Sequence, residues 1–119
     1  LRPQTSDFYI FNEIYLNDEY GLNALPRLDT VIDLGGNIGL FSCAILRKAK
    51  RVIAVEPVTL NFIQLRKNIT RNGGQGSDVL QYAITGRSNE EVPIYLSDRN
   101  TGMDSLFPGW LKNGANRQH

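Results

Sequence analysis

The distribution of apolar positions predicts one repeating unit in the first half of the chain. Val31–Leu34 is a short apolar run with the length and β-branched content of a buried strand. A glycine-rich turn follows, and apolar residues then recur at helical spacing over Leu40–Leu46. A second apolar run, Val52–Val55, ends in Glu56. Strand, turn, helix and strand in this order predict a right-handed βαβ unit of a parallel sheet.

Flanking segments extend this pattern on both sides. Apolar spacing and capping residues predict one helix from Ser6 to Asn17 and another that Thr59 caps and that ends before Asn72. Loose alternation predicts a third strand over 79–85. Residues 92–96 alternate again, and Pro93 in this run places the strand at an edge of the sheet.

These elements predict one α/β domain over residues 1–119, with an incomplete Rossmann-like parallel sheet and flanking helices. Residues 1–28 form a lead-in helix and loop, residues 29–96 a βαβαβ core, and residues 97–119 a loop and tail. The sheet stops after the third strand and the extra edge strand, so the strand at 31–34 keeps an open apolar edge. Open edges pair with other chains, and we expect self-association through this one.

Charge and composition narrow the function classes. The net charge of +1, with both signs interspersed, gives no footprint for nucleic acid. The apolar runs are too short to span a bilayer and no signal-peptide pattern is present, which predicts a cytoplasmic protein without a membrane span. The single cysteine, Cys43, excludes an internal disulfide, and basic residues 47–51 are expected at the end of the first βαβ helix, where cations suit the helix dipole. We expect no metal site.

The glycine turn has three interpretations. It is a tight connection that binds nothing, a dinucleotide site of NAD type, or a site for another nucleoside ligand. A dinucleotide site needs glycines at the first, third and sixth positions of the turn. Counted from Gly35, those later positions hold Asn37 and Leu40, whose side chains would occupy the space of the diphosphate.

Asp33 favours the third interpretation. Its carboxylate comes at the end of the first strand and precedes Gly35 and Gly39 in the spacing Asp-x-Gly-x-x-x-Gly. A carboxylate there suits a ligand that carries an ammonium group and repels a phosphate. Glu56, at the tip of the second strand, suits the two hydroxyls of a ribose, although dinucleotide enzymes use a carboxylate in the same way. Together these residues favour S-adenosylmethionine.

Two segments, VIDLGGNIGLFS and RVIAVEPVTLNFIQLRKNITRNG, resemble the FkbM-type family of S-adenosylmethionine-dependent methyltransferases. The turn Gly35–Gly39, the pair Glu56-Pro57 and the helix segments Asn61-Phe62 and Asn68-Ile69 carry the resemblance, which covers about residues 7–106. The family has alanine more often at the position of Gly36. It usually has a polar pair after Glu-Pro, where this chain has valine and threonine.

The resemblance implies a class I methyltransferase fold, and methyl transfer to a hydroxyl oxygen of a small molecule or glycan, with this chain as the cofactor-binding half. The resemblance implies that Asp33 contacts the methionine ammonium through water and that Glu56 binds the ribose. It implies that Gly35, Gly36 and Gly39 leave room for the cofactor and that Asn37 orients the turn. The adenine faces would be bordered by Pro57, Val58 and Ala83. No residue is a convincing general base, so the catalytic residue stays unassigned. The rival hypothesis is a non-catalytic module that binds cofactor or a partner without turnover.

Overall fold

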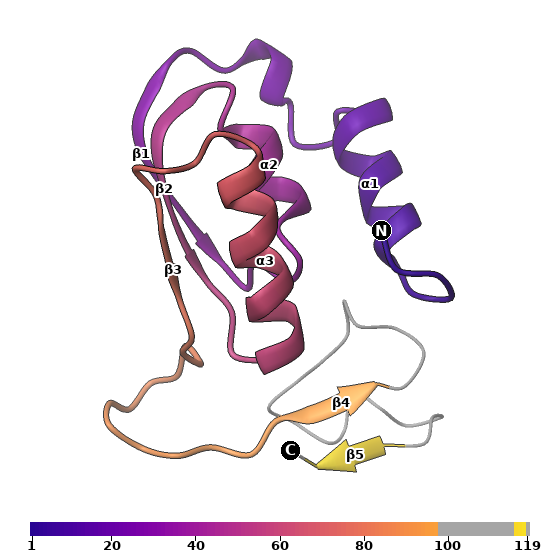
Figure 1. Cartoon of the computed structure of the whole chain (residues 1–119), viewed down its shortest axis with the longest axis vertical. Coiled ribbons are helices and arrows are strands. Elements are labelled where there is room, and N and C mark those ends of the chain that lie inside the picture. The colour runs from indigo at the N-terminus through magenta and orange to yellow at the C-terminus, as the bar shows by residue number, and fades with distance from the viewer. Residues whose placement is uncertain (98–115, 119) are drawn as a thin grey trace. The chain divides into compact units, whose positions relative to one another are not determined.

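The computed structural model describes residues 1–97 and 116–118 (Figure 1). In chain order the elements are α1 (Asp7–Phe11), the π-helix η1 (Asn12–Leu16), the 3-10 helix η2 (Leu22–Ala24), β1 (Leu28–Leu34), α2 (Leu40–Ile45), β2 (Ala49–Val55), α3 (Thr59–Arg71), β3 (Asp78–Leu80), β4 (Tyr95–Ser97) and β5 (Asn116–Gln118). Residues 11–84 form one compact unit, and residues 1–10 with 85–119 form another. None of the described helices has the length and apolarity needed to cross a membrane.

The larger unit contains a three-stranded parallel sheet in the order β1-β2-β3. In its register Val31 lies beside Val52, and Asp33 lies beside Ala54. Strand order follows chain order, and right-handed crossovers therefore bring successive helices to one face of the sheet. Figure 1 shows α2 and α3 on that same face. The predicted α/β fold with a parallel sheet and flanking helices is confirmed.

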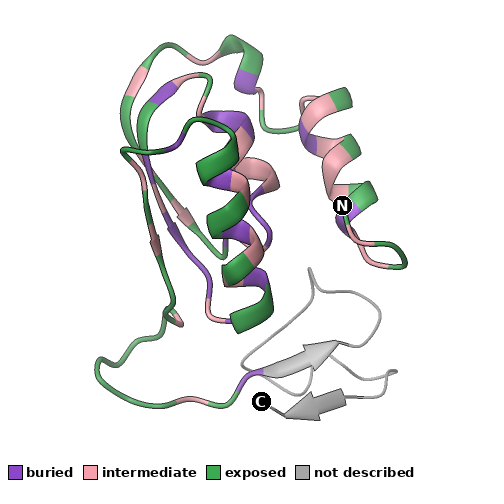
Figure 2. Cartoon of the chain, viewed as in Figure 1, coloured by how far each residue is buried: buried purple, intermediate pink, exposed green. Residues whose placement is uncertain are grey.

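The core of this unit lies between the sheet and the two helices. Val52 and Ala54 of β2 are fully buried. α3 buries Asn61, Leu65 and Ile69, one residue per helical turn, and Figure 2 shows buried segments alternating with exposed ones along this helix. The helix predicted after Thr59 is therefore present. Its apolar pattern predicts a buried face of Phe62, Leu65 and Ile69, and the structure buries Asn61 in place of Phe62, which is half-buried.

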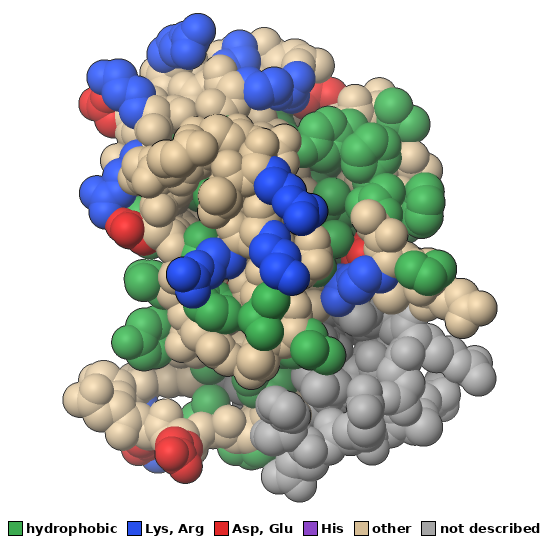
Figure 3. All heavy atoms as spheres, viewed as in Figure 1, with side chains coloured by type: hydrophobic (Ala, Val, Ile, Leu, Met, Phe, Trp, Pro, Cys, Tyr) green, Lys and Arg blue, Asp and Glu red, His purple; other side chains and the backbone are tan. Residues whose placement is uncertain are grey.

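The outer face of α3 is polar and basic. Arg66, Lys67 and Arg71 are exposed, and Figure 3 shows Lys and Arg side chains over this helix. A shallow apolar groove follows the same face, lined by Phe62, Ile63, Arg66, Lys67, Thr70 and Arg71. The groove includes neither the glycine turn nor Glu56.

The basic segment 47–51 follows the helix only in part. α2 stops at Ile45, and Arg47 Nε donates to the Ala44 carbonyl of its last turn at 3.1 Å, but β2 already starts at Ala49. Lys50 and Arg51 lie in β2. There Lys50 forms an ion pair with Asp29 of β1 at 2.7 Å, and Arg51 pairs with Asp78 of β3. Pairing of β2 with β1 at this point, together with these cross-strand ion pairs, favours extended backbone over another helical turn.

The later strands also differ from prediction. β3 is shorter than 79–85, since it pairs only with Ile53–Val55 and β2 ends there. β4 begins after Pro93, which has no N–H to donate to a ladder. It pairs antiparallel with β5 in a two-stranded sheet of its own and not as an edge of the parallel sheet. β5 also shows that 97–119 is not loop throughout, while residues 98–115 lie outside the described part.

The predicted lead-in helix is divided. α1 continues into the π-helix η1, where the Asn17 N–H donates to the Asn12 carbonyl at 2.9 Å. Within the larger unit the rings of Phe11 and Tyr15 stack with centroids 4.7 Å apart, and the Tyr15 hydroxyl donates to the Leu40 carbonyl at 3.2 Å. The hydrogen bond joins η1 to the start of α2, and the stacked rings hold Tyr15 in place for it.

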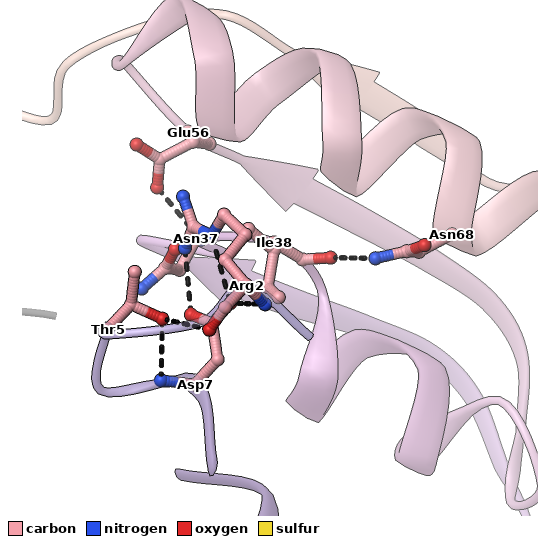
Figure 4. Close-up of polar contacts among 7 residues, drawn as sticks. All are labelled: Arg2, Thr5, Asp7, Asn37, Ile38, Glu56 and Asn68. Atoms are coloured by element: carbon pink, nitrogen blue, oxygen red, sulfur yellow. Dashed lines mark hydrogen bonds and ion pairs between the residues drawn. The ribbon is translucent and has the colours of Figure 1, made fainter. Parts of the chain in front are cut away.

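An ion pair organises the first residues of the chain. Arg2 Nη2 lies 2.8 Å from Asp7 Oδ1, and Arg2 Nε donates to Asp7 Oδ2 at 2.9 Å (Figure 4). Burial raises the pKa of the Asp7 carboxyl, but the hydrogen bonds and charge of Arg2 outweigh burial, so the pKa lies below its ordinary value. The pair therefore stabilises this segment at neutral pH, and the stabilisation is lost on acidification below the ordinary pKa.

β1 has an open edge among the described residues, because β2 is its single partner in the sheet. Asp33 faces α2, where its carboxylate accepts a hydrogen bond from Ser42. Ile32 and Leu34 alternate with it, so they lie on the opposite face and are 62% and 59% exposed. The strand expected to keep an open apolar edge has that geometry here.

Candidate functional site

The candidate site lies at the carboxyl ends of β1 and β2, where open parallel sheets bind ligands. The glycine turn connects β1 to α2, and its left-handed residues are Gly35 (φ +81°), Asn37 (φ +50°) and Gly39 (φ +90°). The N–H groups of Gly35 and Gly36 both donate to the Val55 carbonyl, at 2.9 and 3.0 Å. The turn is thereby attached to the end of β2.

The glycines of the turn have different surroundings. A Cβ at Gly36 would lie 3.0 Å from Leu65 Cδ2, and one at Gly39 would lie 2.7 Å from Leu65 Cδ1. A Cβ at Gly35 would meet nothing within 4 Å. Close approach of α3 therefore accounts for the lack of a side chain at positions 36 and 39, and open space borders Gly35.

Glu56 follows β2 directly and is only 5% exposed. Its Oε2 accepts a hydrogen bond from the Asn37 N–H at 2.8 Å, and its Oε1 accepts one from the Val58 N–H at 3.0 Å (Figure 4). A carboxylate has about four acceptor positions, so each oxygen keeps capacity for one more donor. The arrangement presents a fixed carboxylate that suits two adjacent hydroxyls.

Thr59 does not cap α3 as predicted, because it is the first residue of the helix, and Glu56 binds the N–H of the preceding Val58. The N-cap of α3 is Val58, and no side chain caps it in the usual way. The Thr59 hydroxyl instead accepts a hydrogen bond from Gln81 Nε2 at 2.8 Å. Glu56 is thus shared between the glycine turn and the start of α3.

Asp33 is oriented by a residue that the sequence did not single out. Ser42 of α2 is fully buried, and its Oγ donates to Asp33 Oδ2 at 2.5 Å. Burial raises the pKa of the Asp33 carboxyl above its ordinary value, and the hydrogen bond from Ser42 opposes that rise. Ser42 could have been noticed in the sequence, because it is a small polar residue on the apolar face of a predicted helix.

The remaining predicted site residues follow the ends of β2 and β3. Pro57 is half-buried and Val58 is buried, directly after Glu56. Ala83 is half-buried and follows the end of β3. The structure therefore brings Asp33, the turn, Glu56, Pro57 and Val58 to adjacent strand ends, whereas Ala83 lies in the irregular segment beyond the third strand.

Asn68 of α3 is a second residue that the sequence did not identify as part of the site. Its Nδ2 donates to the Ile38 carbonyl in the turn at 2.7 Å (Figure 4). Its Oδ1 accepts from Gln64 Nε2 at 3.0 Å. Asn68 could have been noticed in the sequence, because it is an asparagine beside the buried face of an amphipathic helix.

Neither catalysis by a cysteine thiolate nor binding of a metal ion has support among the described residues. Burial raises the pKa of the Cys43 thiol to about 11, so this sulfur is a neutral thiol at physiological pH and a weak nucleophile. Within residues 1–97 and 116–118, no group of three or more His, Cys, Asp or Glu side chains lies together as a metal site would require.

The amino-acid sequence of the chain is similar to those of two curated proteins. The chain is 28% identical over 103 residues to Methyltransferase sdnD of Sordaria araneosa, a match covering 84% of this chain and 39% of that protein. It is 25% identical over 101 residues to Methyltransferase 1 of Beauveria bassiana, covering 83% and 40%. The chain is similar to methyltransferases.

The chain is also similar in fold to a solved structure. A Bacillus halodurans protein assigned as a methyltransferase superposes with a TM-score of 0.51 at 21% identity, over 66% of this chain and 35% of that one. This likeness shows the Rossmann-like fold of class I methyltransferases. No sequence profile of a known family matches the chain. The chain spans about two fifths of the length of the two curated relatives.

Proposed function

We propose that this chain is the cofactor-binding half of an S-adenosylmethionine-dependent methyltransferase of FkbM type, which transfers a methyl group to a hydroxyl oxygen of a small molecule or glycan. The observation that carries the proposal is the fixed carboxylate of Glu56 at the end of β2, opposite the N–H of Asn37. Similarity to methyltransferases in sequence and fold supports it.

Each residue of the site has a role in this proposal. When bound, S-adenosylmethionine supplies the electrophilic methyl group. Glu56 accepts hydrogen bonds from the ribose hydroxyls with the acceptor positions that Asn37 and Val58 leave. Asp33, held by Ser42, attracts the methionine ammonium through water. Pro57, Val58 and Ala83 border the adenine, and the rigid turn contributes positioning, which is the main catalytic term for such transfers.

The proposal disfavours a dinucleotide. Asn37 occupies the tip of the turn in a left-handed conformation, where a dinucleotide site has glycine. Asp33 adds a carboxylate at the end of β1 that repels a diphosphate, whereas Glu56 suits the ribose of either ligand. The non-catalytic alternative keeps the same binding site, and an assay of methyl transfer separates it from an enzyme.

The proposal is tested by titrating the chain with S-adenosylhomocysteine and with NAD in a calorimeter. We expect binding of the first and none of the second. Asp33→Asn keeps an oxygen acceptor for Ser42 but removes the charge, and we expect it to weaken binding roughly 3- to 10-fold, as for one water-mediated charge contact. Asp29→Asn, which removes an exposed carboxylate on the same strand, is the matched control. Tight NAD binding with indifference to S-adenosylhomocysteine would overturn the proposal.

The pH dependence of binding gives a second readout for Asp33. Burial raises its pKa above 3.8, so we expect the affinity to fall on acidification with a midpoint above 3.8, as the carboxylate that attracts the ammonium is protonated. At this residue the raised folded-state pKa means that protonation favours the folded chain, so local unfolding does not explain the loss. Asp33→Asn should lack this component and Asp29→Asn should retain it.

We also propose that a second copy of the chain pairs with the open edge of β1. Ile32 and Leu34 are exposed beside that edge, and flat apolar edges pair readily. Light scattering after size exclusion should show a molar mass that rises with concentration, and Ile32→Lys should reduce it. Leu60→Lys, which changes a 76% exposed leucine on α3, should not. A concentration-independent monomer would contradict the proposal.

A further inference from the structure

The tip of the glycine turn, Asn37–Ile38, is held from two sides. Glu56 Oε2 accepts from the Asn37 N–H at 2.8 Å, and Asn68 Nδ2 donates to the Ile38 carbonyl at 2.7 Å. In Figure 4 the two bonds reach the tip from different elements: Glu56 follows β2, and Asn68 lies in the last turn of α3. Two consecutive residues of the turn therefore have one backbone group each fixed by a side chain.

This backbone needs external support. Asn37 has a left-handed φ of +50°, and the turn also contains left-handed glycines at 35 and 39. Such conformations persist where the surroundings determine them. The Gly39 N–H donates to the Gly36 carbonyl at 2.8 Å and closes the turn, but that bond fixes neither the N–H of Asn37 nor the carbonyl of Ile38.

The amide of Asn68 has a defined orientation. Gln64, one helical turn earlier on α3, donates from Nε2 to Asn68 Oδ1 at 3.0 Å. Because that oxygen accepts from Gln64, the Nδ2 group is directed at Ile38. The Ile38 side chain is 2% exposed, so the residue is held through its backbone by Asn68 and through its side chain by the core.

We infer that Asn68 is a positioning residue of the cofactor site: it sets the backbone of the turn tip and so keeps the Asn37 N–H in line with Glu56. The inference rests on the proposed function, since it concerns the same site, and it assigns to α3 a role beyond packing. Loss of the Asn68 amide releases the Ile38 carbonyl, so the Asn37 N–H is aligned with Glu56 Oε2 for less of the time. The Glu56 carboxylate is then less well fixed in the orientation that suits the ribose.

The test compares Asn68→Ala with Asn72→Ala. Asn72 also donates from its amide to a backbone carbonyl, that of Asn68 at 2.8 Å, at the end of α3 and away from the turn. Asn68→Ala should lower the thermal midpoint more than Asn72→Ala, because it loses two part-buried hydrogen bonds and Asn72→Ala loses one that is exposed. We expect Asn68→Ala alone to weaken S-adenosylhomocysteine binding, roughly 5- to 10-fold by the loss of one such bond, and to accelerate amide hydrogen exchange at Asn37–Gly39.

A third variant tests the direction of the bond. Asn68→Asp keeps an acceptor for Gln64 but has no donor for the Ile38 carbonyl, and it should weaken binding at least as much as Asn68→Ala. If the wild type binds S-adenosylhomocysteine and both variants at position 68 bind it equally well, the inference is wrong and the proposed function still holds. Equal losses of affinity in the variants at 68 and 72 would show a structural role only. A wild-type chain that does not bind S-adenosylhomocysteine would refute the proposed function itself.

Discussion

Replacing Glu56 by alanine is expected to weaken S-adenosylhomocysteine binding by about 2–4 kcal/mol, roughly 30- to 1,000-fold. The variant removes two charge-assisted hydrogen bonds to the ribose hydroxyls. It also removes the acceptor for the N–H groups of Asn37 and Val58, at 2.8 and 3.0 Å. Calorimetric titration at a temperature well below the unfolding transition measures the binding effect separately from stability.

Two further variants make the Glu56 result specific. Glu56→Gln keeps the length of the side chain and one acceptor oxygen, and it should bind with an affinity between those of the wild type and Glu56→Ala. Glu19→Ala changes an exposed glutamate after η1 and should leave binding unchanged. Unchanged affinity in Glu56→Ala would mean that the ribose assignment is wrong.

Gly39→Ala is expected to lower the free energy of unfolding by about 2–4 kcal/mol. The residue has φ +90°, where a side chain is strained, and the new Cβ would lie 2.7 Å from Leu65 Cδ1. Leu65 is fully buried between the turn and the sheet, so its side chain has little room to move. Urea denaturation followed by circular dichroism measures the loss.

A matched glycine separates local strain from a general effect of alanine. Gly76 has no left-handed φ, and a Cβ there would meet nothing within 4 Å. Gly76→Ala should therefore change stability by less than about 0.5 kcal/mol. Combining Gly39→Ala with Leu65→Ala should relieve the clash but not the strain at φ, so the two substitutions should be less than additive. A Gly39→Ala chain as stable as Gly76→Ala would contradict the observed packing of α3 on the turn.

Some helices and strands could be predicted from the sequence and others could not. β1, β2 and α3 could be predicted because each contains an apolar run or a helical period, and the observed bounds of α3 agree closely with the pattern. Both strands begin three residues before the predicted runs of 31–34 and 52–55, where strand pairing continues over polar residues. The short β3 and the separate β4–β5 sheet could not, because the length of a strand depends on how far its partner continues. Alternation in a single segment carries no information about that partner.

The sequence by itself determined that Asp33, the glycine turn and Glu56 belong to one βαβ unit, because a right-handed crossover brings the carboxyl ends of neighbouring parallel strands together. Only the tertiary structure decided that Ser42 holds Asp33, that Leu65 fills the space beside Gly36 and Gly39, and that Asn68 binds the Ile38 carbonyl. The physical reason is geometric. Helical periodicity identifies the buried face of α2 or α3, but a hydrogen bond depends on the helix's rotation and axial position to within a few tenths of an ångström, which packing alone sets.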